Sequence, residues 1–160
     1  MRLPTKSAPS GHPEGQNPVF FRAQRLSDPV VVALATDEDL SRIAGSVDCA
    51  SDMLEFWNLL AIRLPAETAV HAVGWRMLLA RPWITSALTR FDRALGAVRT
   101  STGSQYSLGL PGLGKLDPEL GGHVVDVLRS WGFKRVRPIA PKARKTCRGR
   151  KRIRMRTMPS

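Results

Sequence analysis

The chain has 160 residues, enough for one domain with tails, and a formal net charge of +12. Its two cysteines and three scattered histidines do not provide the cluster of about four ligands that a structural zinc site needs, and no apolar run reaches the roughly 20 residues of a membrane-spanning helix. We therefore expect no metal, no cofactor and no contact with a membrane.

Residues 1–18 are predicted to form a flexible arm. Four prolines lie there among Gly, Ser, Asn and Gln, and such a composition buries too little apolar surface to offset the entropy of ordering the chain. The arm also lacks the continuous apolar helix of a signal peptide. We expect a cytoplasmic protein, or a nuclear one in a eukaryotic host, with its domain over 19–133.

The first predicted helix follows Thr36. Thr36 and Asp39 have the spacing of a capping box, in which two side chains bond each other's backbone amides. The next segment, about 50–63, is apolar nearly all round, which is typical of a helix at the centre of a domain or at a partner interface. A short strand at 29–35 is left open, because this apolar run is too brief to assign by periodicity.

Two more helices are predicted in the middle of the chain. Pro65 suits the first position of a helix that runs to about Arg81. In 82–98, five apolar residues recur at steps of four and three, the spacing of one face of an amphipathic helix: Ile84, Leu88, Phe91, Leu95 and Val98. We expect this face to pack on a neighbouring helix or on its copy in a homodimer.

A last helix is predicted from Asp117, its N-cap, to Gly132, with Pro118 in its first turn. Its apolar side consists of Leu120, Val124, Leu128 and Trp131. Five helices joined by short loops predict an all-α fold, a compact helical bundle with a disordered N-terminal arm and a basic C-terminal arm.

The motifs that resemble catalytic sites are incomplete. The sequence GLPGLGKL at 109–116 begins like a phosphate-binding P-loop, but Leu116 stands where that motif has the Ser or Thr that ligates Mg²⁺, and Pro111 has no amide to donate. His123 and Asp126 share one helical face, but no nucleophile accompanies them. We interpret the first as an ordinary glycine-rich loop and predict a protein that is not an enzyme.

Residues 134–160 form a cationic arm that contains no acidic residue, whereas 1–133 has equal numbers of basic and acidic residues. Cationic segments bind phosphates with release of counterions, and arginine-rich ones often order only on RNA or DNA. Twelve residues are therefore predicted to bind nucleic acid: Lys134, Arg135, Arg137, Lys142, Arg144, Lys145, Arg148, Arg150, Lys151, Arg152, Arg154 and Arg156.

The sequence thus predicts a non-enzymatic nucleic-acid-binding protein whose arm contacts phosphates with low sequence specificity. RNA is slightly favoured over DNA, since no helix suited to reading a DNA groove is evident. The alternative is a protein-binding inhibitor or adaptor whose apolar helices dock on a partner protein or a nucleoprotein complex. The arm alone is also compatible with a nuclear-import signal or with contact to an acidic protein or lipid.

Overall fold

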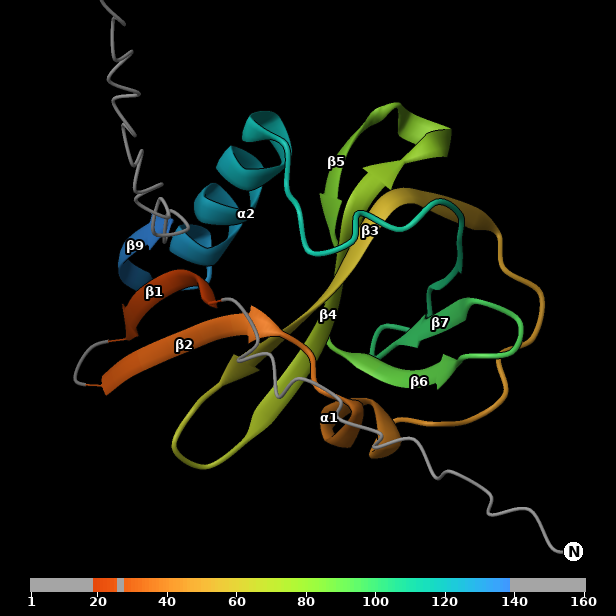
Figure 1. Ribbon diagram of the computed structural model, residues 1–160, viewed down its shortest axis with the longest axis horizontal. Coiled ribbons are helices and arrows are strands. Elements are labelled where there is room, and N and C mark those ends of the chain that lie inside the picture. The colour runs from red at the N-terminus through yellow and green to blue at the C-terminus, as the bar shows by residue number, and fades with distance from the viewer. Residues whose placement is uncertain (1–18, 26–27, 139–160) are drawn as a thin grey trace, which may run out of the picture.

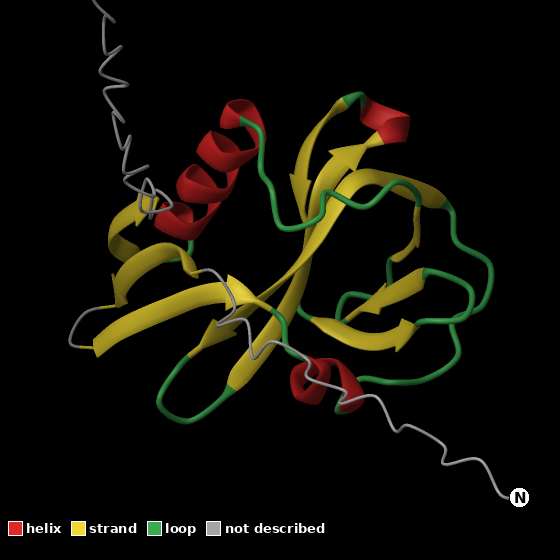
Figure 2. Ribbon diagram, viewed as in Figure 1, coloured by secondary structure: helices red, strands yellow, loops and turns green. Residues whose placement is uncertain are grey.

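Strands, not helices, make up most of the regular structure in residues 19–25 and 28–138, which are the residues that the computed structural model describes (Figure 1, Figure 2). The predicted all-α bundle of five helices is therefore wrong. In the described ranges the strands are β1 (Val19–Arg25), β2 (Asp28–Leu34), β3 (Asp52–Arg63), β4 (Thr68–Arg76), β5 (Arg81–Ile84), β6 (Leu88–Asp92), β7 (Ala97–Thr100), β8 (Gln105–Leu108) and β9 (Phe133–Pro138). The helices are α1 (Asp37–Ser41), the 3₁₀ turn η1 (Met77–Leu79) and α2 (Pro118–Ser130).

All these strands belong to one sheet, with the order β6-β7-β8-β3-β2-β1-β9 along its main path. Every pair is antiparallel except β3 with β8. The first residues of β3 pair with β8 and its last residues with β2, while β4 pairs along β3 and also with β5. Figure 1 shows the long β3–β4 pair in the middle, with β1, β2, β9 and α2 on one side and β6 and β7 on the other.

The β3–β4 pair is buried on both faces. Leu60, Ile62 and Val73 pack into a first core with β1, β2, α2 and β9, whereas Leu59 and Val70 pack into a second core with β6, β7 and β8. Because both faces are covered, consecutive residues of the strand are apolar, as they also are in a fully buried helix. This ambiguity explains why a helix was wrongly predicted for 50–63.

The helix predicted from Pro65 to Arg81 is replaced by β4 and η1. Pro65 lies in the turn between β3 and β4, where the Leu64 amide donates to the Glu67 carbonyl at 2.8 Å. Met77 and Leu78, two hydrophobic residues of this segment, are exposed in η1. The segment forms a strand despite its helical spacing of apolar residues, because its valines favour strands and because β4 pairs with β3 on one edge and β5 on the other.

The amphipathic helix predicted over 82–98 is also wrong, because this segment contains β5, β6 and the start of β7. Four of its five apolar residues are buried, but Leu95 is 72% exposed in the turn between β6 and β7. That turn contains Gly96 in the left-handed region, at φ 60°. The steps of four and three therefore arise from a strand, a turn and another strand.

The predictions of where helices begin are more accurate than the predictions of how far they extend. Asp39 and Thr36 form the expected capping box, with the Asp39 amide donating to Thr36 Oγ1 at 3.1 Å, but α1 ends at Ser41. The next residues pair with β6 instead of continuing the helix, as the bridge between Ala44 and Phe91 shows. The helix predicted from Asp117 is confirmed as α2, and the strand left open at 29–35 is present as β2.

Helix α2 lies against β9 and β5 and covers the first core (Figure 1). Its predicted apolar residues Leu120, Val124 and Leu128 have no exposed surface. Asp117 caps the helix by accepting from the Leu120 amide at 2.8 Å. The helix therefore fixes both the loop before Asp117 and the strand β9 that follows it.

Candidate nucleic-acid interface

Three of the twelve predicted phosphate-binding residues lie on strand β9. Lys134, Arg135 and Arg137 are all exposed, whereas Phe133 and Val136 of the same strand are buried in the first core. The other nine predicted residues, and the N-terminal arm predicted at 1–18, lie outside the described residues. The predicted boundary at 133/134 falls inside β9, so the basic segment begins within the sheet.

A bulge in β9 determines how these cations are presented. Gln24 of β1 pairs with Lys134 of β9, and the next pair is Arg22 with Arg137. Between these two pairs β1 advances by two residues and β9 by three, so β9 contains one extra residue. The bulge contains Arg135, whose φ of 57° lies in the left-handed region. An extra residue of this kind disturbs the alternation of a strand, and here two successive cations, Lys134 and Arg135, are both exposed.

Five other arginines of the described part have carboxylate partners. The ion pairs among the side chains that the structure describes are Arg42–Glu38, Arg63–Asp39, Arg76–Asp52, Arg93–Asp37 and Arg129–Asp126. Desolvation would raise the pKa of Asp52, but hydrogen bonds from Arg76 and from two backbone amides lower that pKa below its usual value. No ion pair joins Lys134, Arg135 or Arg137 to a residue whose side chain the structure describes.

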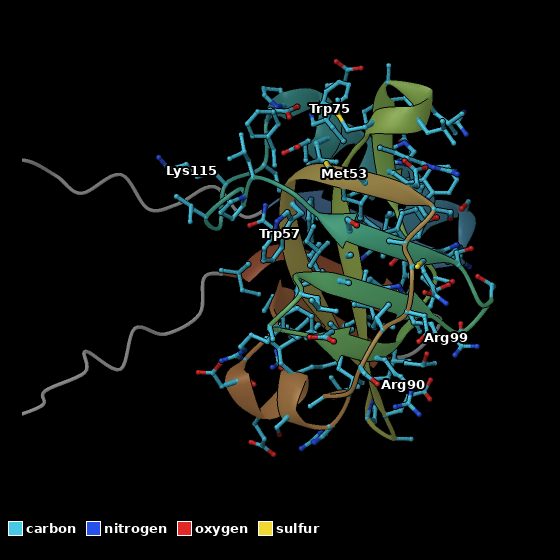
Figure 3. The ribbon with its side chains drawn as sticks, turned by 90° about the vertical axis from the view of Figure 1, so that its right-hand side faces the viewer. Met53, Trp57, Trp75, Arg90, Arg99 and Lys115 are labelled. Carbon is cyan, nitrogen blue, oxygen red and sulfur yellow. The ribbon has the colours of Figure 1, made fainter. Side chains whose placement is uncertain are left out.

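A second pair of cations lies far from β9. Arg90 of β6 and Arg99 of β7 are directly opposite each other and exposed (Figure 3). Like charges in this position destabilise a sheet unless an anion or solvent compensates them. Figure 1 shows β6–β7 and β9 on opposite sides of the β3–β4 pair, so these cations do not extend the β9 surface.

The glycine-rich loop at 109–116 is bonded to β3 through its own amides. The amides of Leu110, Gly112 and Gly114 donate to Glu55 Oε2 (2.6 Å), the Trp57 carbonyl (2.7 Å) and Asn58 Oδ1 (2.7 Å). These amides are not available to a phosphate. A side chain at Gly112 would lie 2.4 Å from Asn58 Nδ2, so the glycine permits close packing of the loop on β3.

Phe56 is the unusual residue of this region. It lies in a bulge of β3 with φ 50° and is 53% exposed. Backbone in this region costs a residue other than glycine about 1–3 kcal/mol and is found where the surrounding structure enforces it, often at functional sites. The exposure of Phe56 was not predicted, because nothing in a run of apolar residues marks a bulge.

A groove of about 370 Å³ lies beside Phe56, and its lining includes Phe56, Trp75, Pro111, Lys115 and Asp117. Trp75 Nε1 donates to Asp117 Oδ2 at 2.8 Å. Desolvation would raise the pKa of Asp117, but hydrogen bonds from the Leu120 amide and from Trp75 lower it below its usual value. Sequence reasoning missed this groove, since the β3–β4 pairing that places Trp75 opposite Glu55 cannot be read from local spacing.

The two histidines of the described part lie on different elements, His123 on α2 and His71 on β4. His123 lies on α2 with Asp126, which is paired with Arg129. His71 is buried in β4, where its Nδ1 lies 2.9 Å from the Thr85 carbonyl and its ring 5.2 Å from that of Trp131. Among the described residues no three His, Cys, Asp or Glu side chains form a group that could hold a metal.

Burial of His71 has a measurable consequence for stability. Desolvation lowers the pKa of His71 below 6.5, against a smaller opposing effect of the Thr85 carbonyl. Below pH 6.5 the unfolded chain therefore binds a proton that the folded chain does not. As the pH is lowered through this range, the free energy of unfolding should decrease by up to about 1.4 kcal/mol per pH unit. Urea unfolding of the parent and of His71→Gln, between about pH 7.5 and 5.5, should show a weaker dependence in the variant, in which His123, whose pKa is also lowered by desolvation, remains. A variant that keeps the full dependence would contradict the assignment to His71.

No family model matches the chain, and no curated protein and no solved structure is significantly similar to it. Neither of the described α-helices combines the length and apolar character needed to cross a membrane.

Proposed function

We propose that the protein is a non-enzymatic nucleic-acid-binding protein with low sequence specificity, and that RNA is slightly favoured over DNA as its partner. The observation that carries the proposal is the cationic surface of β9. There, Lys134, Arg135 and Arg137 are exposed, and none has a partner among the carboxylates whose side chains the structure describes. The sequence that follows has nine more basic residues and no acidic one.

The charge distribution supports a polyanionic partner for this surface. Five arginines of the domain are compensated inside it by ion pairs. Among the side chains that the structure describes, a phosphate chain therefore meets uncompensated charge at β9, at Arg81, Arg90 and Arg99, and at Lys115. Affinity gained from such contacts comes from counterion release and depends strongly on salt. Phosphate contacts alone carry no sequence information, which is why we propose low specificity.

Neutralising the β9 surface should weaken binding. In the triple variant Lys134→Gln, Arg135→Gln and Arg137→Gln, each lost phosphate contact should lower the affinity for single-stranded RNA about fivefold at about 0.1 M salt, giving a loss of about 100-fold if all three act. The slope of log K against log salt should become shallower by about 2. Fluorescence anisotropy with a labelled oligonucleotide at several salt concentrations measures both quantities.

A matched control separates local contacts from overall charge. The triple variant Arg42→Gln, Arg93→Gln and Arg129→Gln removes the same charge from exposed arginines that already have carboxylate partners. Its affinity should stay within about twofold of the parent, since paired surface cations contribute little. Equal losses in the two triple variants would show that β9 is not the contact surface.

One observation favours the second candidate function, a protein-binding inhibitor or adaptor. The apolar helix expected to dock on a partner is the interior strand β3, so that version is excluded. Exposed apolar residues are instead found in η1 and in the glycine-rich loop, including Leu78, Leu110 and Leu113. A partner protein that survives nuclease treatment and is lost with Leu110→Asp and Leu113→Asp would favour this function over nucleic-acid binding.

A further inference from the structure

We infer that the groove beside Phe56 is a stacking site for one unpaired nucleobase, with Lys115 contacting the adjoining phosphate. This inference rests on the proposed function and adds a site to it, because it lies outside the twelve cationic residues of β9 and the chain that follows. Stacking on aromatic side chains is sequence-tolerant, since every base has a π-face. The groove would therefore give preference for single strands without sequence specificity.

The first argument is the enforced exposure of Phe56. Hydrogen bonds of the residues around it hold the bulge against the loop: the Leu110 amide donates to Glu55 Oε2 at 2.6 Å, and the Trp57 amide donates to the Leu110 carbonyl at 3.2 Å. The backbone of Phe56 is thus kept in a left-handed conformation, with the side chain half exposed. Such an arrangement disfavours the folded state and suits a ring that receives a ligand.

The second argument is that Trp75, the other aromatic wall, is already fixed. Its indole Nε1 donates to Asp117 Oδ2 at 2.8 Å, and Asp117 Oδ1 accepts from the Leu120 amide at 2.8 Å. The indole is therefore tied to the start of α2. A ring that is ordered before binding loses little conformational entropy when a base stacks on it.

The third argument is the placement of one uncompensated cation. Lys115 is exposed and forms no ion pair with another described residue, and Figure 3 shows its side chain extending outward, away from the ribbon. Asn58, which is buried, holds the loop by donating from Nδ2 to the Lys115 carbonyl at 2.9 Å and accepting from the Gly114 amide at 2.7 Å. The Asp117 carboxylate also lines the groove, and its negative charge repels a phosphate, so the phosphate is expected at the Lys115 end of the groove.

The size of the groove limits the ligand to about one nucleotide. Its volume of about 370 Å³ is near the lower end of the roughly 300–1,000 Å³ of ligand pockets. Two aromatic walls and a single cation match the chemistry of one base and one phosphate. An apolar peptide side chain would use the rings but leave Lys115 without a partner.

The test compares single-stranded and duplex RNA of the same length, the single strand being an oligouridine with one central 2-aminopurine. The parent protein should bind the single strand more tightly and quench its 2-aminopurine fluorescence. Phe56→Ala should lower single-strand affinity by about 5- to 100-fold, the range expected for one stacked base, and remove the quenching without weakening duplex binding. Lys115→Gln should weaken single-strand binding by about fivefold. Phe56→Gly should behave like Phe56→Ala. Because glycine adopts the left-handed backbone without strain, this second variant shows that the loss of binding is not caused by misfolding of the bulge.

A control and the opposing outcomes keep the inference separate from the proposed function. Leu95→Ala, which alters an exposed apolar residue in the turn between β6 and β7, should change neither affinity nor quenching. If Phe56→Ala binds and quenches like the parent while the β9 triple variant loses affinity for both RNAs, the groove inference is wrong and the proposed function stands. If the parent protein binds neither RNA, both are wrong.

Discussion

Replacing Phe91 by alanine is expected to lower the free energy of unfolding by about 3–5 kcal/mol. Phe91 is 8% exposed and belongs to the second core. Its amide donates to the Ile43 carbonyl at 2.7 Å and its carbonyl accepts from the Gly45 amide at 3.2 Å, so it also anchors the chain after α1. Urea unfolding, with the slope checked for two-state behaviour, measures the loss.

The matched control is Leu95→Ala. In a helix over 82–98, Leu95 and Phe91 would share one buried face and both replacements would be costly. In the structure Leu95 is 72% exposed in a turn, so its replacement should change stability by no more than about 0.5 kcal/mol. A loss for Leu95→Ala as large as that for Phe91→Ala would contradict the sheet.

Two truncations should have different effects on binding and folding. Removing residues 139–160 deletes nine basic residues but no described strand, so affinity for RNA should fall by about 100-fold or more at about 0.1 M salt while the melting temperature changes little. A truncated protein that binds like the parent would show that residues 139–160 are not the contact surface.

The full chain should show a slope of log K against log salt of about −5 to −7 on duplex DNA if six to eight phosphates are contacted.

The longer truncation, of 134–160, should also unfold the domain or weaken it greatly. It removes most of β9, the partner of β1, together with Val136, which is buried in the first core against α2. Burial of that one side chain is worth about 1.5–3 kcal/mol, and the lost pairing adds to it. Thermal unfolding followed by circular dichroism compares the two proteins. Equal melting temperatures would show that β9 contributes nothing to the fold.

The features that sequence predicted correctly are local ones. Thr36 with Asp39 and Asp117 with Leu120 are contacts over three residues, and their physical basis is contained in the sequence itself. The wrong predictions concern residues whose structure depends on distant partners. β3 pairs with β2, β4 and β8, and a strand enclosed in this way has the same apolar run as a buried helix.

The candidate sites also differ in whether they depend on local sequence or on distant partners. Charge composition pointed to Lys134, Arg135 and Arg137, and these residues are exposed on a strand and not in a separate arm. The groove brings together Phe56, Trp75 and Lys115 from β3, β4 and a loop. Only the sheet register places them together, so no spacing in the sequence could have indicated it.

The pairing of β1 with β9 affects how fast the domain folds. It joins the first and the last strand of the described chain, and closing so long a loop costs more chain entropy than forming the β1–β2 hairpin. Contacts between residues distant in sequence also dominate the rest of the sheet. Domains with such topologies fold in about milliseconds to seconds, whereas helical bundles of similar stability fold in about microseconds to milliseconds. We therefore expect slow folding, with the docking of the cationic strand β9 among its last steps.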